Sequence, residues 1–200
     1  MTREAGLWNV ANVLTMVRIV LVPVFVVFLL AGGTAWRLAA LGTFAVASLT
    51  DLLEGRLARS RGLVTDFGKI ADPVADKALT GAALIGLSVL GELPWWVTGV
   101  IMFRELGVTA LRFWVIRRGV IAASRGGKLK TLLQVIAICL YVLPSALSPP
   151  DVVRELFMAA AVVVTVVTGV DYVLQAVRLR RSGPATAPAR VEDLGRHDRG

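Results

Sequence analysis

The stretch "TDLLEGRLARSRGLVTDFGKIADPVADK" (residues 50–77) places four carboxylates between apolar segments: Asp51, Glu54, Asp72 and Asp76. Charge is costly next to hydrocarbon, so acidic groups in such a setting indicate a function. The chain as a whole is strongly hydrophobic, because 56% of its 200 residues are hydrophobic and the mean hydropathy is +0.72. Apolar runs close to the length of a bilayer crossing recur along it, which indicates a polytopic membrane protein.

About six transmembrane helices are expected, since about 20 helical residues cross a hydrocarbon core of ~30 Å. The breaks fall at "AGGTAW", "GELPWW", "RRGVIAASRGG" and "LSPP", which are typical turn sequences. The predicted helices cover residues 9–31, 36–59, 72–90, 94–116, 130–147 and 151–178. The expected fold class is therefore all-α.

The net charge of +8 indicates topology rather than nucleic-acid binding, because the basic residues sit in short loops between apolar runs. The positive-inside rule places these loops, both termini and the acidic stretch in the cytoplasm. We expect a multi-pass protein of the cell membrane with a cytoplasmic active site. Residues 1–181 are predicted to form a single membrane domain, and residues 182–200 a disordered polar tail.

The carboxylates fall on two helical stripes when the residues are placed at 100° each. The first stripe joins Asp51, Glu54, Gly55 and Ala58, and the second joins Gly68, Asp72 and Asp76. The connection between the two helices is short, so the stripes can face each other. The result would be a pocket with four carboxylates that opens to the cytoplasm.

Four carboxylates in one pocket repel one another unless cations or protons neutralise them. Two Mg²⁺ ions balance four negative charges, and a two-metal site can clamp both oxygens of a displacement at phosphorus. The small residues let a phosphate ligand approach the backbone, and Arg59 offers a fork of donors. Two simpler roles stay open: Asp72, before Pro73, could be an N-cap, and Asp51 could pair with a nearby arginine.

The ordered string D-x2-E-G-x2-A-R-x8-G-x3-D-x3-D resembles the signature of the CDP-alcohol phosphotransferases, D-x2-D-G-x2-A-R-x8-G-x3-D-x3-D. Every spacing is kept, and only Glu54 departs, because the family has aspartate there. The six-span layout matches as well, so the resemblance covers about residues 9–178.

This resemblance implies Mg²⁺- or Mn²⁺-dependent transfer of a phosphatidyl group from CDP-diacylglycerol to an alcohol, with release of CMP. In that reaction Asp76 would take the proton from the attacking hydroxyl. By analogy the two metal ions would be held by Asp51, Glu54, Asp72 and Asp76. The CDP-diacylglycerol would be contacted by Gly55, Ala58, Arg59 and Gly68. The family also includes homodimers.

The acceptor is indicated by "NVLTMVR", "FRELGVTALR", "GGKLKT" and "DPVADK", which resemble the bacterial branch of the family that uses glycerol 3-phosphate. Charges inside a predicted span are functional by default, and basic residues outnumber Glu105 there. Surplus cations suit an acceptor with its own phosphate. The predicted acceptor-phosphate ligands are Arg18, Arg104, Arg112, Lys128 and Lys130.

Several alternatives remain open. Arg104, Glu105 and Arg112 could form an ion-pair cluster that fixes helix packing. Asn12 and Thr15 could line the donor site or form interhelical hydrogen bonds. The acceptor could be an inositol phosphate or phosphatidylglycerol. A weakly catalytic scaffold and a small cation transporter are further candidates, although transporters usually place charges near mid-membrane in broken helices.

Overall fold

The computed structural model describes the backbone of residues 10–61, 66–115 and 125–181, and the side chains of residues 13–50, 75, 77–111 and 127–178. This part of the chain is helical and contains no strand, which confirms the all-α class. The helices are α1 (Val10–Ala31), α2 (Thr34–Arg61), α3 (Asp66–Val89), α4 (Trp95–Val115), α5 (Arg125–Val142) and α6 (Asp151–Arg181), with a short 3-10 turn η1 (Ser145–Leu147). The predicted tail at residues 182–200 lies outside the described residues.

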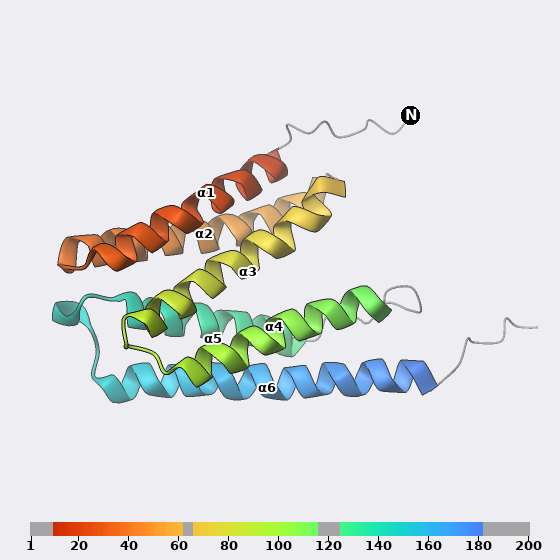
Figure 1. The fold of residues 1–200 in the computed structure, drawn as a ribbon. Coiled ribbons are helices and arrows are strands. Elements are labelled where there is room, and N and C mark those ends of the chain that lie inside the picture. Colours follow the sequence, from red (N-terminus) through yellow and green to blue (C-terminus); the bar gives the residue numbers. More distant parts are fainter. Residues whose placement is uncertain (1–9, 62–65, 116–124, 182–200) are drawn as a thin grey trace, which may run out of the picture.

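The helices run alternately in opposite directions along a bundle (Figure 1). The start of α1, the end of α2, the start of α3 and the end of α6 therefore lie at one end of the bundle. The α1–α2 turn, the α3–α4 turn and η1 lie at the other end.

The third helix begins earlier than the sequence suggested. α3 starts at Asp66 and not at Asp72, so Asp72 is the seventh residue of the helix and cannot be its N-cap. An acidic residue is favoured at a helix N-terminus, and no proline follows before position 73, so Asp66 can open the helix. The interpretation of Asp72 as a cap is wrong.

The fifth helix is also displaced toward the N-terminus. α5 runs from Arg125 to Val142, instead of from residue 130 to residue 147. Pro144 has no N–H with which to continue the helical ladder, so the chain leaves the helix and forms η1. The α3–α4 turn lies where it was predicted, and Gly91 adopts a φ of 74° there, which favours glycine.

The hydrophobic core draws side chains from all six helices. Phe25 of α1 packs on Phe44 of α2 with ring centroids 5.6 Å apart. Gly86 of α3 permits the close approach of α1, because a Cβ at this position would lie 2.6 Å from Cδ2 of Leu29. A larger residue at position 86 would force the buried Leu29 side chain to move in a closely packed interior.

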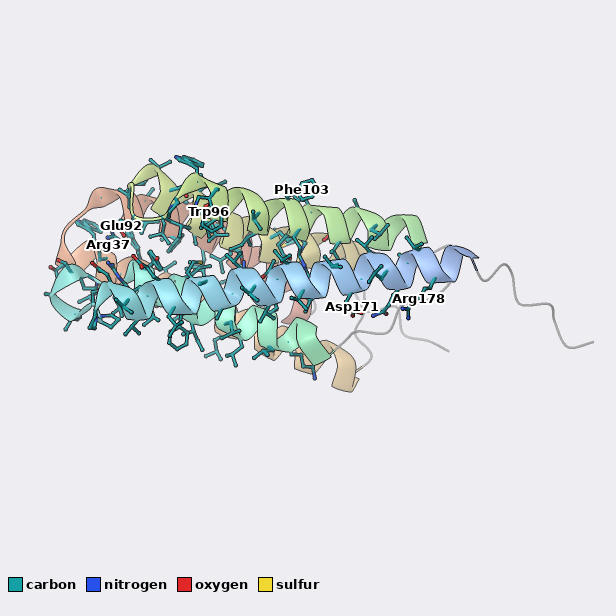
Figure 2. All side chains as sticks on the ribbon, turned by 90° about the horizontal axis from the view of Figure 1, so that it is seen from below. Arg37, Glu92, Trp96, Phe103, Asp171 and Arg178 are labelled. Carbon is teal, nitrogen blue, oxygen red and sulfur yellow. The ribbon has the colours of Figure 1, made fainter. Side chains whose placement is uncertain are left out.

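The outer surface of the bundle is strongly apolar. Phe103 of α4 is 82% exposed and points away from the bundle (Figure 2). Extended apolar surfaces of this kind mark contact with a membrane or another protein. Among the described residues, two stretches, Val13–Ala31 and Asp151–Arg178, are long and apolar enough to cross a bilayer. These features indicate a membrane protein, while the number of spans and their orientation stay predictions.

An ion pair joins helices at the end of the bundle that carries the α1–α2 and α3–α4 turns. Arg37 near the start of α2 pairs with Glu92, which follows α3 (Figure 2). The Arg37 guanidinium also donates a hydrogen bond to the carbonyl oxygen of Tyr141, at 3.4 Å. The pair therefore ties α2 to both the α3–α4 turn and α5.

Candidate functional site

The predicted carboxylate motif lies on both sides of the α2–α3 junction. Residues 51–59 belong to the last half of α2, and residues 68–76 belong to the first half of α3. The two helices contact each other. Figure 1 places this junction at the same end of the bundle as the start of α1. The motif's side chains lie outside the described residues, so the facing of the two stripes stays a prediction.

A small cavity lies inside the bundle beside this motif, with a volume of about 60 Å³. Ser48 of its lining comes one helical turn before Asp51, and Lys77 directly follows Asp76. The polar lining includes Arg18, Ser48, Lys77, Glu105, Lys130 and Gln134. Residues from five helices, α1 to α5, therefore meet next to the motif.

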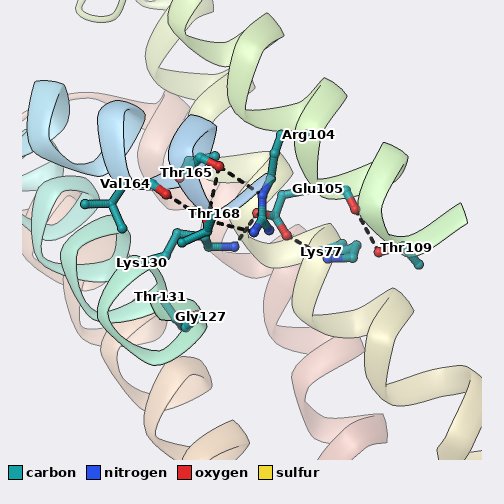
Figure 3. Close-up of polar contacts among 10 residues, drawn as sticks. All are labelled: Lys77, Arg104, Glu105, Thr109, Gly127, Lys130, Thr131, Val164, Thr165 and Thr168. Carbon is teal, nitrogen blue, oxygen red and sulfur yellow. Dashed lines mark hydrogen bonds and ion pairs between the residues drawn. The ribbon is translucent and has the colours of Figure 1, made fainter. Parts of the chain in front are cut away.

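Glu105 of α4 is the centre of a buried charge cluster at this cavity. The Nζ of Lys77 on α3 donates to its Oε2 at 2.8 Å, and Nη1 of Arg104 donates to its Oε1 at 3.2 Å. Lys130 of α5 pairs with Oε1 as well. Figure 3 shows the carboxylate between these cations. One negative charge, on a residue that is only 8% exposed, thus meets three positive charges and joins α3, α4 and α5.

Arg104 also binds α6. Its Nε donates to the carbonyl oxygen of Thr165 at 3.1 Å, and its Nη2 donates to Oγ1 of Thr168 at 2.9 Å (Figure 3). The arginine lies close against Gly169, where a Cβ would come within 2.9 Å of its Cγ. These contacts fit the alternative in which Arg104 fixes the packing of α4 on α6.

The other predicted acceptor residues occupy different places. Arg18 and Lys130 both line the cavity, and both are buried. Lys128 is exposed and does not line it. Thr15 is fully buried on α1, one turn from Arg18, but does not line the cavity either. The side chains of Asn12 and Arg112 lie outside the described residues.

Lys77 and Gln134 line the cavity although neither was predicted as a site residue. Gln134 follows Lys130 by four residues, so both lie on one helix face, and this spacing was a signal in the sequence. Lys77 carried no comparable signal. Its neighbour Asp76 belongs to a different face of the same helix, because successive residues are about 100° apart.

The donor chemistry of the motif suits a divalent metal, since hard cations prefer carboxylate oxygens. The described side chains contain no group of three or more histidine, cysteine, aspartate or glutamate residues that could hold such an ion. The four motif carboxylates lie outside them and therefore remain the candidate metal ligands.

Comparisons with known proteins point in one direction. Residues 8–167 match the family model described as CDP-alcohol phosphatidyltransferase. A probable phosphatidylglycerophosphate synthase of Mycobacterium tuberculosis H37Rv is 56% identical over 178 residues, which cover 88% of this chain and 85% of the relative. The CDP-diacylglycerol–glycerol-3-phosphate 3-phosphatidyltransferase of Bacillus subtilis 168 is 38% identical, over 83% of this chain and 94% of the relative. The Escherichia coli K12 protein of the same name is 37% identical, over 66% of this chain and 75% of the relative.

Proposed function

This chain belongs to the CDP-alcohol phosphatidyltransferase family, and we propose that it transfers a phosphatidyl group from CDP-diacylglycerol to glycerol 3-phosphate. The products are phosphatidylglycerophosphate and CMP. The names of the relatives from three bacteria support this choice of donor and acceptor. The protein is accordingly a transferase of phospholipid biosynthesis.

The charge balance of the cavity is the observation that supports an acceptor with a phosphate. Among the described side chains, Lys77, Arg104 and Lys130 share one carboxylate, that of Glu105. A buried surplus of positive charge is costly unless an anion compensates it. A phosphate group supplies that anion, whereas neutral glycerol does not. Asp76 and Lys77 are successive residues of α3 whose side chains leave the helix about 100° apart, so a phosphate held by Lys77 would keep the acceptor at the level of Asp76 along the helix.

The motif carboxylates Asp51, Glu54, Asp72 and Asp76 would hold two divalent ions, Mg²⁺ or Mn²⁺. Bound there, such ions neutralise charge on the diphosphate of the donor. Asp76 takes the proton of the acceptor hydroxyl while the hydroxyl oxygen forms a bond to the lipid-bearing phosphorus. The bond from that phosphorus to the oxygen of CMP breaks, and CMP leaves with the bonding electrons.

The donor site would lie beside the metal ligands on α2 and α3. Gly55, Ala58 and Gly68 would admit the diphosphate close to the backbone, and Arg59 would donate to it. Asn12 and Thr15 on α1 would line its other side. The whole site would open to the cytoplasm, with six membrane spans and both termini on that side.

An acceptor panel tests the proposal. The full chain in detergent micelles receives labelled CDP-diacylglycerol, a divalent ion and one acceptor: glycerol 3-phosphate, glycerol, an inositol phosphate or phosphatidylglycerol. We expect glycerol 3-phosphate to give a labelled phospholipid that carries a terminal phosphate. A faster reaction with any other acceptor would refute the proposed acceptor. No lipid product and no CMP with any acceptor would instead support a scaffold without catalysis.

A further inference from the structure

Glu105 is the shared partner of two lysines that line the same cavity. Its Oε2 accepts from Lys77 on α3, and its Oε1 pairs with Lys130 on α5. The two ammonium groups therefore sit at opposite oxygens of one carboxylate (Figure 3). A single side chain on α4 thus contacts cations from two other helices.

Both lysines have hydrogen-bonding capacity left for a ligand. An ammonium group carries three N–H donors, and Glu105 is the only partner of either lysine within the described part of the chain. Gln134 lines the same cavity at 4% exposure, and its amide nitrogen has no hydrogen-bond partner among the described residues. Donors from α3 and α5 thus surround a space that a group with several acceptor oxygens would satisfy.

Arg104 supplies the rigid support for this arrangement. It shares Oε1 of Glu105 with Lys130, and its remaining contacts hold it to Thr165 and Thr168 on α6. Arg104 therefore differs from the two lysines, because it donates hydrogen bonds to α6 as well as to Glu105. Among the described residues, each lysine side chain donates only to Glu105. The carboxylate is therefore fixed from the α6 side and holds the lysines on the cavity side.

We propose that Glu105 is a positioning residue for the acceptor and that Lys77 joins Lys130 in binding the acceptor's phosphate. This inference rests on the proposed function. Glu105 does not touch the phosphate itself, because two anions repel each other. It holds Lys77 and Lys130 in position, so that their remaining N–H donors face the phosphate oxygens. The two lysines then lose less side-chain freedom when the phosphate binds.

The test uses Glu105→Gln, which keeps the size of the side chain and removes its charge. We expect the KM for glycerol 3-phosphate to rise roughly tenfold or more, because a buried charge pair is broken at the binding group. The KM for CDP-diacylglycerol should stay unchanged. Glu92→Gln is the matched control, since it breaks the ion pair with Arg37 at the other end of the bundle. Both KM values should stay unchanged in that variant.

An unchanged or lower acceptor KM in a folded Glu105→Gln protein would overturn the inference, and a loss of thermal stability alone would assign Glu105 a purely structural role. If this variant does not fold, Lys77→Gln replaces it, because it leaves the pair between Glu105 and Lys130 intact. The same selective rise in acceptor KM is then expected, and its absence would again overturn the inference.

The wild-type protein separates this inference from the proposed function. If it forms no product with glycerol 3-phosphate, the proposed function fails, and calorimetry with inorganic phosphate then tests the cluster. Phosphate binding by the wild type that is lost in Glu105→Gln would still support the positioning role. Equal binding by both proteins, or none by either, would overturn it.

Discussion

Glu105 shows what a buried carboxylate requires from its surroundings. Burial between α3, α4 and α5 removes most of the water that would solvate its charge, so protein cations must compensate it. Among the described side chains three of them do, and the proposed acceptor phosphate would compensate the excess of positive charge that they leave. The same residue therefore contributes to helix packing through Arg104 and to the proposed acceptor site through the lysines.

Asp76 is the residue whose substitution should affect the rate most directly. Asp76→Asn keeps the size of the side chain but removes the base and one proposed metal ligand. We expect kcat to fall by ~10²–10⁴-fold or more, because base catalysis alone contributes that much. CMP release in micelles measures this, with circular dichroism as a check on helix content. Full activity in the folded variant would exclude Asp76 as the base.

Glu54 stands where the family signature has aspartate, so the effect of its longer side chain can be tested. The additional methylene shifts the carboxylate by more than Mg²⁺ coordination at ~2.0–2.1 Å tolerates, unless the site adapts. We expect Glu54→Asp to match or exceed the starting activity, and the glutamate protein to tolerate Mn²⁺ better than Mg²⁺. Activity assays with each ion measure both effects.

Glu54→Ala is the companion variant. It should lose most activity, because the proposed metal pocket would lose a charge and a ligand. Two results would contradict the assignment of this position: an inactive Glu54→Asp protein would mean that the site is built around glutamate, and a fully active Glu54→Ala protein would mean that residue 54 is no ligand.

At the scale of helices, hydrophobic runs and turn residues predicted the elements well. α1, α2, α4 and α6 begin and end within three residues of the predicted ranges. The starts of α3 and α5 were missed, because their first turns contain polar and glycine residues that belong to no apolar run. The end of α5 was missed as well, because the apolar run continues past Val142, where the helix ends. A boundary drawn from hydrophobicity alone leaves such turns outside the helix.

In the site, as in the helices, features that depend on one local segment differ from features that depend on contacts between distant segments. The carboxylate stripes are a prediction from spacing along one helix at a time, and they stay untested because the motif's side chains lie outside the described residues. The contacts of Glu105 with Lys77 and Lys130 could not be predicted, because 28 and 25 residues separate the partners. Such pairs depend on which helix faces pack together, and the local pattern does not contain that information.

Gly169 tests the contact between α4 and α6. Gly169→Ala would place a Cβ 2.9 Å from Cγ of Arg104, whose head group is held by hydrogen bonds. We expect a loss of roughly 1–3 kcal/mol in the free energy of unfolding, as for other overpacked sites. Thermal unfolding in micelles measures it.

Gly107→Ala on α4 is the control, because among the described residues its added Cβ would meet open space beyond its own helix. This variant should be as stable as the wild type or slightly more so, since alanine favours helix. Equal stability of both variants would show that Arg104 is not confined at Gly169.

At the scale of the whole molecule, the alternation of helices separates the two ends of the bundle. One end carries the motif and both chain ends of the described bundle, and the other carries η1 (Figure 1). The positive-inside rule predicts that the first end faces the cytoplasm.

Labelling of single cysteines tests this orientation in a Cys139→Ser background. We expect a membrane-impermeant maleimide added to intact cells to label Ser145→Cys in η1 and not Arg181→Cys at the end of α6. Labelling of Arg181→Cys and protection of Ser145→Cys would reverse the assigned orientation.

Release of CMP by the purified full chain tests the central claim most directly. With CDP-diacylglycerol and Mg²⁺ in micelles, we expect glycerol 3-phosphate to drive CMP release and plain glycerol to support little of it. EDTA should stop the reaction, and renewed Mg²⁺ should restore it. Equal release with glycerol, or release that persists in EDTA, would contradict a metal-dependent transfer to a phosphate-bearing acceptor.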